Sequence, residues 1–225
     1  MLTVSGLAVS IANAPILRGV SFTLGAGETV ALVGRNGAGK TTTLRAVMGL
    51  AAFSGGAIQF GGVELTKVAP HLRPGLGIGY APEDRRLFSA FNVEQNILLP
   101  AEVARLPAAE TARRLERTYA ILPELKELAA RPAGSVSGGQ GKMVALARAL
   151  MLGTKLIFLD EPFQGLAPAL AKRYGDSLQR LRGLDPGLTI LITESNPALL
   201  ERFATRTLLI ERGEISEVTA KARQT

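Results

Sequence analysis

Eight residues near the N-terminus constrain the fold of this chain more than any other stretch. They match the phosphate-binding loop pattern G-x-x-x-x-G-K-[ST], and they are Gly34, Arg35, Asn36, Gly37, Ala38, Gly39, Lys40 and Thr41. An apolar run at residues 29–33 precedes the loop and predicts a buried strand, whereas residues 41–50 predict a helix. The loop therefore has the strand–loop–helix context that a phosphate site needs.

The residue types of this loop suit a polyphosphate. N–H groups at a helix N-terminus are donors aimed along a favourable dipole, and glycines such as Gly37 and Gly39 allow positive φ and a close approach. We expect Lys40 to reach the β- and γ-phosphates of a nucleoside triphosphate, the Thr41 hydroxyl to ligate Mg²⁺, and Thr42 to bond an α-phosphate oxygen. The alternative is a glycine-rich turn with a solvated lysine, which the eight matching positions argue against.

Composition narrows the class of protein without choosing a function. The chain has 225 residues, 47% of them hydrophobic, which predicts one large domain or a domain with a subdomain. It has no cysteine, so disulfides, thiolate zinc sites and cysteine nucleophiles are excluded, and a reducing compartment fits. No apolar run reaches the roughly 18 residues of a membrane helix, and residues 1–14 read as a strand rather than a signal peptide. The net charge of +7 is compatible with attraction to ATP, an anionic leaflet or nucleic acid.

Strands and helices alternate along the chain, which predicts an α/β fold with a mostly parallel sheet covered on both faces. The expected strands are residues 2–9, 16–24, 29–33, 57–60, 63–65, 76–81, 155–161, 188–193 and 207–210. Residues 93–131 and 141–151 predict helices, and another is marked by Leu170, Tyr174, Leu178 and Leu181.

The segment 93–131 reads as a helical insertion into the α/β core. Its predicted apolar face consists of Ala108, Ala112, Leu115, Tyr119 and Leu122. We interpret the arginines off this face, at positions 113, 114 and 117, as a solvated surface.

Two carboxylates, Asp160 and Glu161, end an apolar strand, where ligands gather in open α/β sheets. Beside a phosphate loop, Asp160 is expected to hold Mg²⁺ through water, and Glu161 to orient and deprotonate the water that attacks the γ-phosphate. Strand ends often carry acids, so this pair on its own is a weak signal.

A second glycine-containing loop, Ser137-Gly138-Gly139, opens a second helix and predicts a second anion site. The alternative is an ordinary N-cap at Ser135 or Ser137. One chain with one phosphate loop does not need two such sites, so the second is expected to serve the nucleotide of a partner.

These motifs together resemble those of ATP-binding cassette (ABC) ATPases. The LSGGQ signature of that family is matched by Val136, Ser137, Gly138, Gly139 and Gln140. The phosphate loop, the signature, residues 156–162 and residues 165–168 follow in the family's order. The resemblance implies an ABC ATPase fold with an N-terminal antiparallel β part. Residues 1–92 and 152–225 would form the β part and catalytic core, and residues 93–151 a helical subdomain.

The resemblance also implies a head-to-tail dimer. Two ATP molecules would lie between the phosphate loop of one subunit and the signature of the other, with Ser137 and Gly139 contacting the γ-phosphate across the interface. The implied cofactors are ATP and Mg²⁺.

A finer resemblance concerns residues 80–88, 92–96 and 165–168, which are similar to segments of the ATPases of branched-chain amino-acid importers. Urea and aromatic-acid importers share much of this pattern. The similarity implies a peripheral subunit on the cytoplasmic face of the inner membrane that energises uptake of a small solute. Its partners would be a like or unlike ATPase, membrane permease subunits that bind near residues 83–88 and the helical insertion, and indirectly a solute-binding protein.

Some positions depart from the general family pattern. Ile11 replaces the aromatic residue that stacks on adenine, Glu83 replaces a metal-contacting glutamine as in the importer group, and Ser195 replaces the switch histidine. Ile11 can cover the base but offers no π-face. The one histidine, His71, is assigned to the surface. We expect hydrolysis to persist but to be slow, with Glu161, Glu83 and Ser195 in catalytic positions.

Two other function classes remain open at this point. A soluble ABC ATPase acting on nucleic acid or ribosomes fits the basic charge, but such proteins generally carry coiled coils, zinc modules or two cassettes, so no nucleic-acid partner is expected. A regulatory cassette that binds ATP with little hydrolysis fits the missing histidine, whereas Glu161 argues against it.

Overall fold

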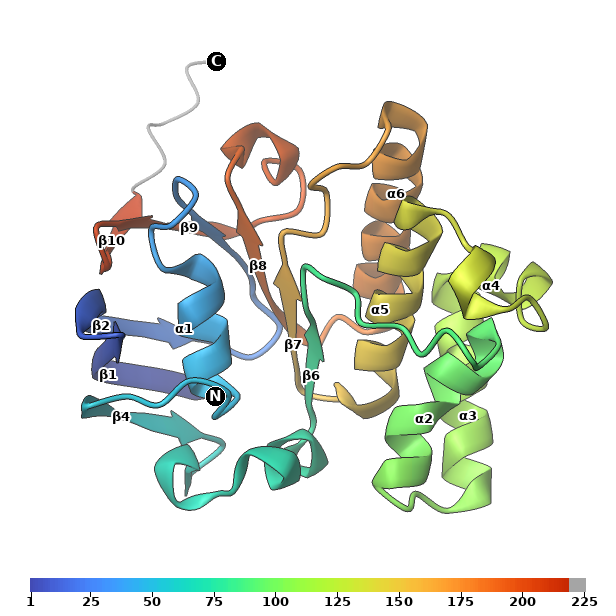
Figure 1. The fold of residues 1–225 in the computed structure, drawn as a ribbon, viewed down its shortest axis with the longest axis horizontal. Coiled ribbons are helices and arrows are strands. Elements are labelled where there is room, and N and C mark those ends of the chain that lie inside the picture. The colour runs from blue at the N-terminus through green and yellow to red at the C-terminus, as the bar shows by residue number, and fades with distance from the viewer. Residues whose placement is uncertain (219–225) are drawn as a thin grey trace. The chain divides into compact units, whose positions relative to one another are not determined.

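A computed structural model describes residues 1–218; residues 219–225, the end of the predicted catalytic core, lie outside the described residues. The chain divides into two compact units. The first comprises Met1–Arg73 together with the chain from Thr189 onward, and the second comprises Pro74–Leu188. The whole predicted helical segment, residues 93–151, lies in the second unit. Figure 1 labels the main elements of both.

The first unit opens with an antiparallel sheet of order β2-β1-β4-β5, which confirms the expected N-terminal antiparallel part. Its strands are β1 (Leu2–Ile11), β2 (Ala14–Leu24), β4 (Gly55–Phe60) and β5 (Val63–Glu64). Leu2, Val4, Leu7 and Val9 of β1 are fully buried, as an amphipathic strand requires. The predicted hairpin turns at Gly61 and Gly62, both with positive φ.

The same unit carries strands in the order β10-β9-β3-β8. They are β3 (Thr29–Val33), β8 (Thr189–Glu194), β9 (Arg206–Glu211) and β10 (Glu214–Val218). β3 pairs in parallel with β8 and β9, and all five of its residues are buried. β10 pairs antiparallel with β9 and was not expected, because only Ile215 and Val218 in it are apolar.

Helix α1 (Lys40–Val47) follows the phosphate loop and contacts β2 and β8. It ends three residues before the predicted Leu50. Gly49 adopts a φ of 76°, and the N–H groups of Gly49 and Leu50 bond the carbonyls of Ala46 and Arg45. A left-handed glycine closes the helix, which the apolar spacing alone could not reveal. Short 3₁₀ turns occur at Leu65–Lys67, Pro70–Leu76 and Pro197–Leu199.

The second unit contains the parallel pair β6 (Ile78–Ala81) and β7 (Leu156–Asp160) and five α-helices within the described residues. These helices are α2 (Val93–Val103), α3 (Ala108–Ile121), α4 (Pro123–Glu127), α5 (Gly138–Leu152) and α6 (Pro168–Leu184), with a 3₁₀ turn at Ala133–Ser135. α5 contacts α2, α3, α4, β6 and β7, and ten of its residues are buried. It is the central helix of this unit, whereas α6 buries the predicted Tyr174, Leu178 and Leu181.

The predicted apolar face of α3 is confirmed only in part. Leu122 is fully buried and Leu115 and Tyr119 are partly buried, whereas Ala108 and Ala112 are exposed. Within the helix itself the buried side chains are Thr118 and Ile121. The face that packs against the unit also includes arginines, which sequence periodicity had assigned to solvent.

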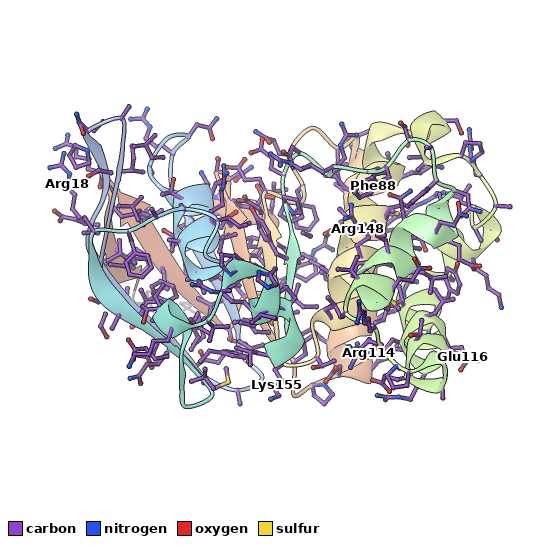
Figure 2. All side chains as sticks on the ribbon, turned by 60° about the horizontal axis from the view of Figure 1, so that its bottom comes forward. Arg18, Phe88, Arg114, Glu116, Arg148 and Lys155 are labelled. Atoms are coloured by element: carbon purple, nitrogen blue, oxygen red, sulfur yellow. The ribbon has the colours of Figure 1, made fainter. Side chains whose placement is uncertain are left out.

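Arg114 and Arg117 lie in ion pairs on that face. Their side chains are only 16% and 21% exposed. Arg114, labelled in Figure 2, bonds Glu110 and the carbonyl of Met151, and Arg117 bonds Asp185. Arginine can bury its apolar stem and still satisfy its guanidinium, so it joins α3 to its neighbours. Arg113 and Glu116 are exposed, as expected.

In the part of the chain that the structure describes, there is no helix with both the length and the apolar composition to cross a membrane.

Candidate functional site

The phosphate loop of the first unit connects β3 to α1, and its glycines are needed for different reasons. Gly37 has a φ of 79° with no atom near the position of a Cβ, so only its backbone conformation requires glycine. At Gly34 a Cβ would lie 2.3 Å from the carbonyl oxygen of Ile210, so packing requires it. Gly39 combines both reasons, with a φ of 113° and only 2.7 Å to Leu17 Cδ2.

Lys40 is buried, and its ammonium group is held inside the loop. Its Nζ donates to the carbonyl oxygens of Gly34 at 2.7 Å and Arg35 at 3.2 Å, and to Ser195 Oγ at 3.1 Å. The Ser195 hydroxyl in turn donates to Asn36 Oδ1 at 2.7 Å. The structure therefore brings the predicted Lys40, Asn36 and Ser195 together at the start of α1.

The start of α1 is suited to an anion. Its N-cap residue is Gly39, which has no side chain to cap the helix, and the first turn contains no acidic residue. The helix dipole and the Lys40 charge both favour negative charge at this end. Thr41 and Thr42 are partly buried in the same turn, so the hydroxyl of Thr41 is an oxygen donor of the kind that Mg²⁺ takes.

Ile11 and His71 lie elsewhere in the first unit. Ile11 is 54% exposed at the end of β1, so its apolar surface is open to a ligand. His71 is exposed in the 3₁₀ turn Pro70–Leu76, in agreement with its assignment to the surface.

In the second unit, Asp160 and Glu161 end β7 and are 2% and 6% exposed. The hydroxyl of Tyr80 on the neighbouring strand β6 donates to Asp160 Oδ2 at 3.1 Å. Glu161 has a φ of 45°, a left-handed conformation that is uncommon for a residue with a Cβ. A tight backbone turn thus separates the two carboxylates.

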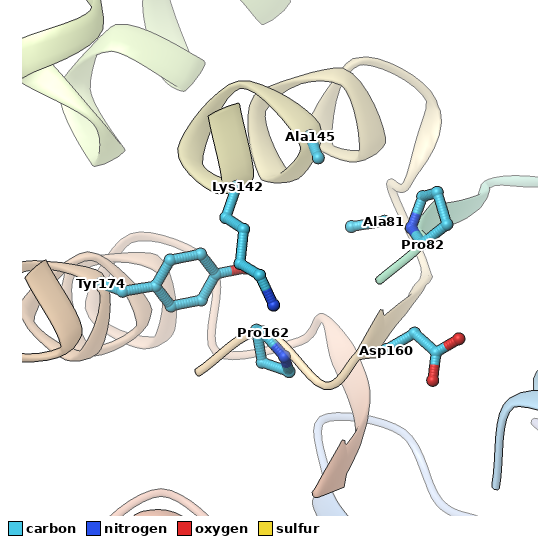
Figure 3. A pocket seen from close by; sticks show the side chains of 7 residues that line it. All are labelled: Ala81, Pro82, Lys142, Ala145, Asp160, Pro162 and Tyr174. Carbon is cyan, nitrogen blue, oxygen red and sulfur yellow. The ribbon is translucent and has the colours of Figure 1, made fainter. Parts of the chain in front are cut away.

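Lys142 of α5 reaches the same place. Its Nζ donates to the carbonyl oxygen of Glu161. Figure 3 shows the lysine pointing toward Pro162 in a small recess that Asp160 and Tyr174 also line. Sequence reasoning missed Lys142 and Tyr80. Lys142 is one of only two charged residues in the mostly apolar α5, which was the one available signal for it.

Glu83 follows β6 and is exposed. Partial burial raises its pKa, and the nearby negative charges of Glu161 and Asp160 raise it further, while Lys142 opposes them. The three predicted carboxylates are therefore close enough to interact. Within residues 1–218 no three His, Cys, Asp or Glu side chains converge as a self-sufficient metal site. Mg²⁺ commonly takes one or two protein oxygens and completes its shell with phosphates and water, which fits a donor such as Asp160.

The signature residues form the first turn of α5, which starts at Gly138 and not at the predicted Gly141. Ser137 is the N-cap: its hydroxyl accepts from the Gln140 N–H at 3.2 Å, and Gln140 Oε1 accepts from the Ser137 N–H at 2.9 Å. This capping box offsets the poor helix propensity of three glycines. Because of those glycines, the sequence predicted a helix start at Gly141 and not at Gly138. Val136 precedes the cap and is partly buried.

Packing explains the signature glycines. A Cβ at Gly139 would lie 2.4 Å from Leu170 Cδ1 of α6, and one at Gly138 would lie 3.1 Å from the Arg85 guanidinium. That guanidinium donates to the Gly138 carbonyl at 3.1 Å. Ser137 and Gly138 are exposed, so this helix start is accessible.

Comparison with known proteins decides the family. Residues 17–164 match the family model described as ABC transporter. The chain belongs to the ABC transporter family. It is 34% identical over 186 residues to a probable branched-chain amino acid transport ATP-binding protein, LivF, of Archaeoglobus fulgidus, covering 83% of this chain and 78% of the relative.

Other ABC transporter proteins are also similar. The lipopolysaccharide export system ATP-binding protein LptB of Escherichia coli is 32% identical, over 95% of this chain and 88% of LptB. A solved structure of the ATP-binding subunit of an ABC transporter is 29% identical with a TM-score of 0.84, over 98% of this chain and 90% of that one. The expected ABC ATPase fold is thus confirmed, and the chain is an ATP-binding ABC ATPase.

Proposed function

We propose that this ABC ATPase hydrolyses ATP to energise an importer for a small solute, with branched-chain or other hydrophobic amino acids as the first candidates. The observation that carries the hydrolysis is the buried Glu161, held in a fixed turn at the end of β7. The likeness to LivF supports the substrate class.

The residues have distinct roles in this proposal. The loop N–H groups and Lys40 bind the β- and γ-phosphates, and Ile11 covers the base. Thr41, Asp160 and Glu83 would hold Mg²⁺, which would neutralise phosphate charge. Glu161 orients the attacking water and takes its proton, and Ser195 donates a hydrogen bond to the γ-phosphate.

A second ABC ATPase subunit, like or unlike, completes the site. The accessible start of α5 supports this part of the proposal, because Ser137 and Gly138 are exposed while Gly139 is packed against α6. Ser137 and Gly139 would serve the ATP of the partner subunit in a head-to-tail dimer.

Membrane permease subunits are the proposed partners that use the motion. The exposed Phe88 lies under the Arg148 guanidinium, whose Cζ is 5.5 Å from the ring centroid. Figure 2 labels both residues. An exposed aromatic side chain held by an arginine suits a protein contact. A solute-binding protein would act through those permeases, and the subunit would lie on the cytoplasmic face of the membrane.

Export is a second candidate, because the likeness to LptB covers 95% of this chain. Deletion of the gene, followed by uptake of labelled leucine and by assay of surface lipopolysaccharide, separates the two. Loss of leucine uptake with intact lipopolysaccharide supports import.

Phosphate release by the purified chain and by Glu161→Gln tests the enzymatic part. We expect slow hydrolysis by the wild type and a fall of about 100-fold or more in the variant. Equal rates would remove Glu161 from the mechanism. Salt-dependent DNA binding would instead favour a nucleic-acid ATPase, and ATP binding without hydrolysis would favour a regulatory cassette.

A further inference from the structure

The backbone of Glu161 is held in an unfavourable conformation. Its φ of 45° brings the Cβ of an L-residue close to its own carbonyl oxygen, which is why glycine usually occupies such positions. Conformations of this kind persist only where the surroundings determine them. The carbonyl oxygen of Glu161 is one group through which the surroundings act.

Two donors hold that carbonyl oxygen. One is the N–H of Gln164, at 3.2 Å, which closes the local turn. The other is the Nζ of Lys142, 19 residues earlier in the chain. The first bond belongs to the loop itself, whereas the second fixes the loop to the buried helix α5.

The position of Lys142 suits this task. Its side chain is half-buried and lies in the recess with Asp160 and Tyr174 (Figure 3). Tyr174 is fully buried and packs edge-on against Phe163, with ring centroids 5.4 Å apart, so this wall of the recess is closely packed. An ammonium group also brings positive charge close to the Glu83 carboxylate, which the negative charges of Glu161 and Asp160 repel.

We propose that Lys142 is a positioning residue for ATP hydrolysis. Its ammonium group anchors the Glu161 carbonyl and thereby fixes the turn from which the Glu161 carboxylate meets the attacking water. This inference rests on the proposed function, in which Glu161 is the general base.

Kinetics of Lys142→Met, Lys142→Arg and the control Lys126→Met test the inference. Lys126 is an exposed lysine of the same unit, in α4. We expect Lys142→Met to lower kcat by about 10- to 100-fold, because a base displaced by about 1 Å loses that much. KM for ATP should stay nearly unchanged. Lys142→Arg, which can still donate to the carbonyl, should recover most of the rate, and Lys126→Met should match the wild type.

A double variant separates positioning from a merely structural effect. In a Glu161→Gln background the base is already lost, so adding Lys142→Met should leave the residual rate unchanged. An equal fold-loss in both backgrounds, or a wild-type kcat in Lys142→Met, overturns the inference. If thermal melting shows that Lys142→Met is unfolded, the same comparison is made with Lys142→Gln.

The two proposals fail in different ways. A wild-type chain that does not hydrolyse ATP, or a Glu161→Gln variant that hydrolyses at the wild-type rate, overturns the proposed function and the role of Lys142 with it. Normal behaviour of those two proteins with an unaffected Lys142→Met overturns only the inference about Lys142.

Discussion

Two helices of this protein begin with glycine-rich turns, and they differ in how the turn is completed. α1 begins after Gly39, which provides no cap, and a buried lysine lies inside its loop. α5 begins after Ser137, whose hydroxyl and Gln140 cap each other, and the cap is exposed. The first helix start is therefore organised to hold an anion within one chain. The second satisfies its own backbone donors through the capping box and leaves the cap exposed, which is why we propose it as the contact with a partner's nucleotide.

The largest effect is expected for a substitution at the start of α1. Lys40→Met removes the ammonium group and should weaken ATP binding by about 3 kcal/mol, or roughly 100-fold, because hydrogen bonds from a charged donor are strong. Calorimetric titration with ATP and Mg²⁺ measures the change. The same titration of Lys126→Met provides the control, and unchanged binding in Lys40→Met would show that the loop does not bind phosphate.

Glycine substitutions in the loop should differ between neighbouring positions. Gly39→Ala meets both a φ of 113° and Leu17 at 2.7 Å, so it should lower the free energy of unfolding by about 3 kcal/mol. Gly37→Ala has space for its methyl group and should cost about 1 kcal/mol, from its backbone alone. Urea denaturation of both variants gives the comparison, and equal losses would contradict the packing argument.

Removal of the N-cap of α5 should have a smaller effect, and it should weaken the dimer and not ATP binding by the single subunit. Ser137→Ala should lower the free energy of unfolding by about 1 kcal/mol. ATP affinity of the single subunit should stay at the wild-type value, whereas closure of the ATP-bound dimer in the Glu161→Gln background should weaken. Size-exclusion chromatography with ATP measures the dimer, and a loss of affinity in the single subunit would refute the assignment of Ser137 to a partner's nucleotide.

The smallest expected change is in Ser195→Ala. The Ser195 hydroxyl is a neutral group that accepts a hydrogen bond from Lys40 and donates one to Asn36. Its loss should weaken ATP binding by about 0.5 to 1 kcal/mol. Titration calorimetry beside Lys40→Met measures both, and an effect as large as that of Lys40→Met would show that the hydroxyl has a greater role.

Local sequence patterns predicted the elements that local chemistry determines. The phosphate loop, the buried strand before it and the carboxylates after β7 follow from short motifs in the right context. The start of α5 could not be predicted in this way, because Gly138, Gly139 and Gly141 are poor helix formers. A capping box stabilises the helix there.

Contacts between distant residues also escaped prediction. Tyr80 meets Asp160, Lys142 meets the Glu161 carbonyl, and Arg117 meets Asp185 across separations of 80, 19 and 68 residues. Such pairs depend on how elements pack, which periodicity within one helix or strand does not encode. The roles of the site residues themselves stay predictions until the experiments above are made.

The half-buried lysine near the start of α5 has a mechanical consequence. The N-cap Ser137 and Lys142, which bonds the Glu161 carbonyl, belong to one continuous helix, α5, and lie little more than a helical turn apart. In the proposed dimer, a displacement of the exposed N-terminus of α5 by the partner subunit would therefore move the group that holds the Glu161 backbone. In a symmetric dimer, a nucleotide bound to one subunit would thus affect the position of Glu161 in the other subunit. The effect would pass through helix α5 and not through a flexible segment.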